Sequence, residues 1–94
     1  MAGFSQEHLD DLLANELNNW SLDDGCLYRE WHFSNWAEAD RAFQRLSVLA
    51  EQADHHPKIC IEWGRLAVWL KTHEGDFIGE KDLGLALQFN ASID

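Results

Sequence analysis

The period of the hydrophobic pattern changes after Phe33, and this change limits the possible fold more than any other feature of the sequence. Residues 26–33 alternate between apolar and polar, as expected for a β-strand whose successive side chains point to opposite faces. From residue 36 onward apolar residues recur at intervals of three and four, which is typical of an amphipathic helix. They are Trp36, Ala39, Phe43, Leu46, Ala50 and Ala53. A chain that switches between the two periods predicts an α+β fold.

The rest of the chain repeats the two patterns. Ser5 can cap a first helix, which Asn18-Asn19 ends. Its leucines have helical spacing: Leu9, Leu12, Leu13 and Leu17. Segments 20–22 and 26–33 flank the turn signal Asp23-Asp24-Gly25, which predicts a β-hairpin. One face of residues 26–33 carries Leu27, Arg29, Trp31 and Phe33, and the other carries Cys26, Tyr28, Glu30 and His32.

A second hairpin and a third helix follow the long helix, which Ser34 or Asn35 can cap. Segments 59–63 and 66–73 flank Gly64-Arg65. Residues 80–90 have helical spacing, with an expected core stripe of Leu83, Ala86, Leu87 and Asn90. The predicted order, helix, two strands, helix, two strands, helix, gives an antiparallel sheet with helices packed against it.

Length and charge exclude several classes of protein. Ninety-four residues suit a single domain, residues 1–94. The net charge of −10, with only seven Lys and Arg, argues against nucleic acid and against anionic membranes. No apolar run approaches the roughly 20 residues that span a bilayer, and the start of the sequence does not resemble a secretory signal. Cys26 and Cys60 have no metal-type spacing, so we expect a cytoplasmic protein with free thiols. Five Trp and five Phe exceed what a small core needs, which favours a homo-oligomer.

Candidate functional residues surround the only proline, in the stretch EQADHHPKICIEW. Pro57 disfavours helical geometry at His56, so the helix should stop near Asp54 and leave His55 and His56 where helix passes into strand. His73 follows a neighbouring strand and can reach the same end of the sheet. Glu51, one helical turn before His55, and Asp82, near the start of the third helix, could each hydrogen-bond an imidazole.

Three interpretations of these histidines are open from the pattern alone. A catalytic zinc site would need three protein ligands, but adjacent histidines rarely bind one ion, and no His-x-x-x-His or Cys-x-x-Cys pair is present. An acid–base centre would use imidazoles that gain and lose protons near neutral pH. Exposed polar residues without a task are the third alternative.

The segment from Glu51 to Asp82 resembles the signature of the pterin-4a-carbinolamine dehydratase family, known also as the dimerisation cofactor of a homeodomain transcription factor. The matching residues are Glu51, His55, His56, Pro57, Trp63, His73 and Asp82, in that order and at the family's spacing. Trp20 and the segment LYREWHFSNWAEADRAF are similar to the family's upstream pattern, so the resemblance covers nearly the whole chain.

The resemblance implies a four-stranded antiparallel sheet with three helices on one face, and a homodimer or a dimer of dimers. It implies dehydration of 4a-hydroxytetrahydrobiopterin to quinonoid dihydropterin, beside aromatic amino-acid hydroxylases, without a metal or cofactor. His55 and His73 would be the proton-transfer pair, and His56 would orient the substrate. Substrate-binding residues would be Pro57, Thr72, Glu74, Gly75 and Trp20, with Glu51 and Asp82 supporting the imidazoles. The alternative implied by the family is a non-catalytic module that assists dimerisation or assembly of another protein.

Overall fold

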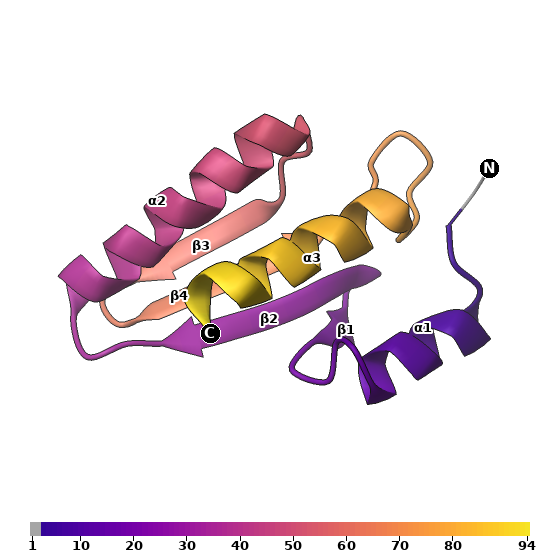
Figure 1. The fold of residues 1–94 in the computed structure, drawn as a ribbon, viewed down its shortest axis with the longest axis horizontal. Helices are drawn as coiled ribbons and strands as arrows, with labels where there is room; N and C mark the ends of the chain where they lie inside the picture. Colours follow the sequence, from indigo (N-terminus) through magenta and orange to yellow (C-terminus); the bar gives the residue numbers. More distant parts are fainter. Residues whose placement is uncertain (1–2) are drawn as a thin grey trace.

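The computed structural model describes residues 3–94 and contains three helices and four strands (Figure 1). In chain order they are α1 Gln6–Ala14, β1 Ser21–Asp23, β2 Cys26–His32, α2 Trp36–Ala53, β3 Lys58–Glu62, β4 Arg65–Leu70 and α3 Glu80–Ile93. The order α-β-β-α-β-β-α is the one that the sequence predicted. No helix in this part of the chain is long and apolar enough to cross a membrane.

The four strands form one antiparallel sheet in the order β1-β2-β4-β3, so β2 and β4 are central. The β1–β2 hairpin turns at Asp24 and Gly25, whose φ angles are 52° and 75°. Both residues therefore occupy the left-handed region that two-residue hairpin turns require, and Asp and Gly tolerate it well. The turn signal in the sequence marked this hairpin correctly.

The second hairpin differs from the prediction by one residue. Its turn is Trp63-Gly64, because Glu62 pairs with Arg65, and β4 ends at Leu70 rather than at His73. Gly64 packs so closely on the backbone that a Cβ there would lie 2.7 Å from the Phe33 carbonyl oxygen. Beyond Leu70 the chain forms a loop closed by an isolated pairing of Thr72 with Phe77.

The helices pack their apolar side chains against one face of the sheet, and α2 and α3 lie across that face in Figure 1. Asn35 caps α2 by accepting the Glu38 N–H at 2.9 Å, and Ser5 caps α1 in the same way. The first helix is shorter than predicted, since it ends at Ala14, yet Leu17 is still fully buried beyond it. The largest buried side chains of the core are Phe89, Leu17, Leu27, Leu46, Leu66, Leu70, Leu85 and Val68.

The buried face of α3 agrees with the predicted stripe at Ala86 and partly at Leu83, and differs elsewhere. The structure buries Asp82, Leu85, Ala86 and Phe89, whereas Leu87 is 37% exposed. This helix is apolar on most sides, so the hydrophobic pattern alone does not determine its rotation. Polar anchors at both ends do: Asp82 bonds into the end of the sheet, and the Asn90 side chain accepts the Trp20 indole N–H at 2.8 Å.

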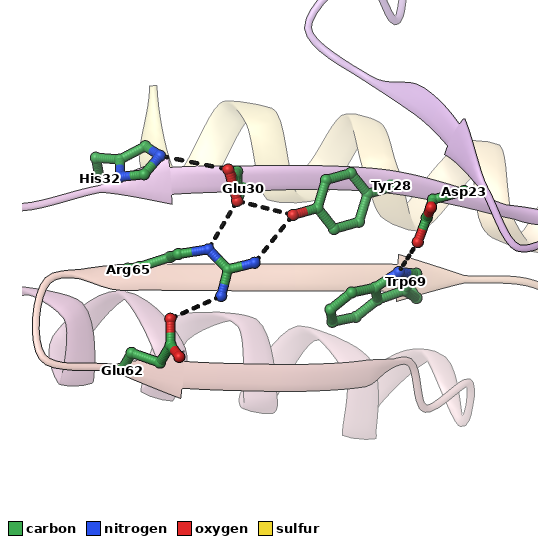
Figure 2. Close-up of polar contacts among 7 residues, drawn as sticks. All are labelled: Asp23, Tyr28, Glu30, His32, Glu62, Arg65 and Trp69. Atoms are coloured by element: carbon green, nitrogen blue, oxygen red, sulfur yellow. Dashed lines mark hydrogen bonds and ion pairs between the residues drawn. The ribbon is translucent and has the colours of Figure 1, made fainter.

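The helix-free face of the sheet carries a polar network (Figure 2). Arg65 donates to Glu30, Glu62 and the Tyr28 hydroxyl, at 2.7, 2.8 and 3.1 Å. The hydrogen bond from Arg65 lowers the pKa of the Glu30 carboxyl, and its bonds to Glu30, Tyr28 and Glu62 raise the pKa of Arg65. The side-chain periodicity of β2 therefore separates an apolar face from a polar one, as the alternation predicted.

A second ion pair attaches the end of α3 to β2. Arg29 bonds both carboxylate oxygens of Asp94 at 2.9 Å, and this contact lowers the pKa of Asp94 below its ordinary 3.8. Because the folded pKa is depressed, the pair stabilises the fold above the unfolded value and loses that contribution as the pH falls.

We expect Asp94→Asn to lower the free energy of unfolding by about 0.5–1 kcal/mol near neutral pH, since the carboxylate is partly exposed. At a pH below the folded pKa of Asp94, which itself lies below 3.8, the two proteins should converge, because the parent's carboxylate is then protonated as well. Urea unfolding at both pH values measures the difference. A gap of equal size in acid would show that the stabilisation is not ionic.

Candidate active site

The end of α2 places the two adjacent histidines. Asp54 ends the helix in the left-handed region at φ 50°, and the His55 N–H donates to the Ala50 carbonyl at 3.1 Å. Pro57 then keeps the preceding residue extended, and β3 begins at Lys58. His55 and His56 therefore lie where the chain reverses from helix into an edge strand, as the sequence predicted.

Asp82 is the centre of a buried hydrogen-bonded group. Its side chain is fully buried, and one oxygen lies 2.6 Å from Nε2 of His55. The other oxygen accepts from the Thr72 hydroxyl and from the Gly79 N–H, both at 2.9 Å. An ionised carboxylate only accepts hydrogen bonds, so these three donors satisfy it without solvent. The end of α2, the loop after β4 and the start of α3 are thus joined at one end of the sheet (Figure 1).

The same contact determines the tautomer of His55. With Nε2–H donating to Asp82, the neutral ring carries its lone pair on Nδ1. Within residues 3–94 no buried side-chain nitrogen or oxygen lacks a hydrogen-bond partner, and no bond to Nδ1 is present. Nδ1 is therefore not fully buried, although the His55 side chain as a whole is only 9% exposed.

His56 is held differently, on the surface. Its Nε2 lies 2.8 Å from Glu51 Oε1, and both side chains are mostly exposed. Because both side chains remain in contact with water, the pair contributes little to the stability of the fold. Its main effect is to orient the His56 ring. Glu51 and Asp82 thus contact one imidazole each, His56 and His55 respectively; their roles in catalysis stay a prediction.

His73 lies in the loop after β4 and is exposed. The loop is closed by the Thr72–Phe77 pairing and by an ion pair of 2.6 Å from Lys71 to Asp76. The hydrogen bond between them raises the pKa of Lys71 and lowers the pKa of Asp76, so both groups stay charged. Thr72 and His55 both bond the Asp82 carboxylate. His73 follows Thr72 in the sequence, so it is adjacent along the chain to a member of the buried group.

A cavity of about 240 Å³ lies beside His73. The cavity is lined by Asp23, Asp24, Cys26, Lys58, Trp69, Lys71 and His73. Of these, only His73 was among the residues predicted for the site. Two of the lining residues, Lys58 and Trp69, could have been grouped from the register of the second hairpin, because they are direct partners in the β3–β4 pair. Which hairpins lie next to each other could not be read from the local pattern, so nothing in the sequence linked Lys58 to Asp23.

The remaining predicted binding residues lie in two places. Thr72, Glu74 and Gly75 belong to the His73 loop, and Glu74 and Gly75 are exposed. Trp20 is 4% exposed and packs edge-on to Trp31 in the core, with ring centroids 6.0 Å apart. Its expected place at a pocket wall stays a prediction. Among residues 3–94 no three His, Cys, Asp or Glu side chains are grouped as metal ligands would be.

Fold and site together define a two-layer α+β protein with a carboxylate-supported histidine site at one end of its sheet. Residues 2–92 match the family described as Pterin 4 alpha carbinolamine dehydratase, and the chain belongs to that family. Two bacterial relatives carry the name pterin-4-alpha-carbinolamine dehydratase provisionally. The protein of Mycobacterium sp. (strain KMS) is 35% identical over 94 residues, which cover 100% of this chain and 99% of that one. The protein of Thermomicrobium roseum is 39% identical over 74 residues, covering 79% and 80%.

Two solved structures share the fold. A transcriptional coactivator/pterin dehydratase from Brucella melitensis superposes with a TM-score of 0.91, at 24% identity, over 98% of this chain and 99% of that one. A pterin dehydratase-like protein, described as a RuBisCO assembly factor in the alpha-carboxysome, superposes with a TM-score of 0.65 at 19% identity, over 79% and 86%. At these identities the likeness establishes the four-stranded sheet and its helices, and nothing about activity.

Proposed function

We propose that the chain is a hydro-lyase that removes water from a 4a-hydroxytetrahydropterin and gives the quinonoid dihydropterin. The observation that carries this proposal is the hydrogen-bonded group of His55, Asp82 and Thr72, with His73 directly after Thr72. Two imidazoles at one end of the sheet, one with a defined tautomer, suit a reaction that needs one proton delivered and one removed. Family membership supports the same reaction.

The reaction breaks the bond between carbon 4a and its hydroxyl oxygen. A proton must reach the leaving oxygen, which departs as water, while a ring nitrogen loses a proton and its lone pair drives the expulsion. His55, through Nδ1, and His73 are the proposed proton-transfer pair, a use for which imidazoles are well suited near neutral pH. His56, oriented by Glu51, would position the pterin ring.

The pterin's polar edge would bind along the backbone of residues 55–57 and 72–75. Pro57 limits the conformations of the first segment, and the Lys71–Asp76 ion pair closes the second, so both segments keep their shape. Rigid backbone donors and acceptors lower the entropy cost of holding a flat heterocycle. Thr72, Glu74, Gly75 and Trp20 belong to this proposed binding set.

In the cell, we propose recycling of tetrahydrobiopterin in the cytoplasm, beside the aromatic amino-acid hydroxylases that make the carbinolamine. We also propose a homo-oligomer, for which Trp36 and Val48 on α2, 50% and 56% exposed, offer apolar contact area. A protein-assembly role is the second candidate, because one structural neighbour is described as an assembly factor. Such a role would not require the His55–Asp82 group.

A direct assay tests the proposal. Purified protein is added to freshly generated 4a-hydroxytetrahydropterin, and the decay of its ultraviolet absorbance is followed. We expect the decay to accelerate in proportion to protein concentration, and a fold-preserving His73→Ala variant to lose the effect. If the parent protein leaves the uncatalysed decay unchanged, the dehydratase assignment is wrong and the assembly role gains support.

A further inference from the structure

The loop that carries His73 contacts the N-terminal segment of the chain. The loop is closed by two backbone hydrogen bonds: the Thr72 N–H donates to the Phe77 carbonyl at 2.7 Å, and the Phe77 N–H donates to the Thr72 carbonyl at 3.2 Å. Directly after Phe77, the Ile78 carbonyl accepts the Phe4 N–H at 2.8 Å. Both segments lie at the same end of the molecule in Figure 1. The chain before α1 is therefore joined to the loop before α3.

The Phe77 ring lies against three glycines, which we call the glycine socket: Gly3, Gly75 and Gly79. A Cβ added at Gly75 would lie 2.3 Å from the ring, one at Gly3 would lie 2.8 Å from it, and one at Gly79 would lie 3.0 Å from it. Non-bonded carbon atoms prefer separations of about 3.5–4.0 Å, so none of the three positions has room for a side chain beside this ring. Three of the six glycines of the sequence therefore contact one aromatic side chain.

The glycine socket restrains a part of the loop that other contacts hold weakly. The Lys71–Asp76 ion pair also spans the loop, but the Asp76 side chain is 79% exposed. Exposed pairs contribute little, because water competes for both charges. The bond from Thr72 to Asp82 fixes only the start of the loop. The end of the loop is held by the socket, and the position of His73 between the two ends depends on both.

We propose that Phe77, held in the glycine socket by the N-terminal segment, is a positioning residue for His73. The inference rests on the proposed dehydratase function, in which His73 transfers a proton. The His73 side chain is exposed, so the backbone of its loop decides where the imidazole can reach. Proton transfer needs heavy atoms within about 2.6–3.2 Å, and a shift of about 1 Å is enough to slow a reaction strongly.

Gly3→Ala tests the inference without changing the loop itself. The added methyl group would lie 2.3 Å from the Ile78 carbonyl oxygen and 2.8 Å from the Phe77 ring, so the N-terminal segment has to move away. We expect the Phe77 amide to exchange its hydrogen about tenfold faster, because the loop opens more often. We expect kcat for the carbinolamine to fall about tenfold. Exchange followed by NMR and the absorbance assay measure the two quantities.

Gly84→Ala is the matched control for this substitution. Gly84 lies within α3, and a Cβ added there meets nothing within 4 Å. Exchange at Phe77 and kcat should both match the parent in this variant.

A double-mutant cycle separates positioning of His73 from general support of the fold. Phe77→Ala should lower kcat of the parent about tenfold. In a His73→Ala chain, assayed with more protein, the same substitution should cause no further loss, because no imidazole is left to position. An equal loss in both backgrounds overturns the inference. Gly3→Ala replaces Phe77→Ala in the cycle if the latter chain fails to fold.

Two further results overturn the inference: exchange at Phe77 that is unchanged in Gly3→Ala, and faster exchange with a parental kcat. A parent that leaves carbinolamine decay unchanged overturns the dehydratase function instead. Faster exchange in Gly3→Ala would then still support the restraint of the loop by the N-terminal segment.

Discussion

Replacement of His73 by Ala is expected to slow dehydration by about 10²-fold or more, with the free energy of unfolding changed by less than about 0.5 kcal/mol. The side chain is exposed in its loop, so its removal leaves no cavity and no buried unpaired group. The loss would come from a missing proton-transfer group at the leaving oxygen or the ring nitrogen. Absorbance decay of the carbinolamine and urea unfolding of the same preparation measure the two quantities.

His32 provides the matched control. It is also an exposed histidine near a carboxylate, 3.5 Å from Glu30, but it pairs with Arg65 at the opposite end of the sheet. His32→Ala should therefore turn over substrate like the parent. His55→Gln, which retains a donor for Asp82, combined with His73→Ala should abolish acceleration. Parental rates in that double variant would contradict the assignment of these imidazoles.

Removal of the Asp82 carboxylate is expected to have the largest effect on stability. Asp82→Ala leaves the His55 ring, the Thr72 hydroxyl and the Gly79 N–H without their common acceptor in a buried place. Loss of one partner of such a buried polar group costs about 3–5 kcal/mol, a large part of the roughly 5–15 kcal/mol that stabilises a domain. Urea unfolding followed by tryptophan fluorescence measures this loss.

The chain contains its own control for this experiment. Glu51 forms the other carboxylate–imidazole contact, with His56, but both side chains are mostly exposed. Glu51→Ala should cost less than about 1 kcal/mol, because water replaces the lost contact. If the two variants unfold at the same urea concentration, the Asp82 group is not the stabilising centre described above. Thr72→Val, which removes a single donor, should fall between them.

Much of the fold could be predicted because its signals are local. Asp24-Gly25 supplies the positive φ angles of the first hairpin, and Pro57 limits α2, which ends at Ala53. The errors of the prediction come from contacts between distant segments. The second hairpin turns at Trp63-Gly64 because Glu62 pairs with Arg65, and Gly64 passes close to the Phe33 carbonyl. The third helix, α3, is apolar on too many sides for its buried face to be chosen from the pattern.

The candidate site also has a part that the sequence predicted and a part that it did not. His55, His56 and His73 could be named as candidates because they match the signature of the family that the sequence resembles, and so could the carboxylates of Glu51 and Asp82. The sharing of the Asp82 carboxylate among three donors could not be predicted, because nothing in the sequence links Thr72 and Gly79 to Asp82. The grouping of Lys58 and Asp24 at the cavity beside His73 was likewise outside any local pattern.

Sequence alone therefore determined the order of helices and strands, the start of each helix, and the placement of two histidines where a helix passes into a strand. Backbone torsion preferences and side-chain periodicity act over a few residues, so the local sequence determines these features. Only the tertiary structure decided how α3 is rotated, which donors meet in the buried group, and which side chains face the cavity. Those outcomes depend on packing between segments distant in the chain, where many local arrangements are equally acceptable until the core and its buried polar groups select one.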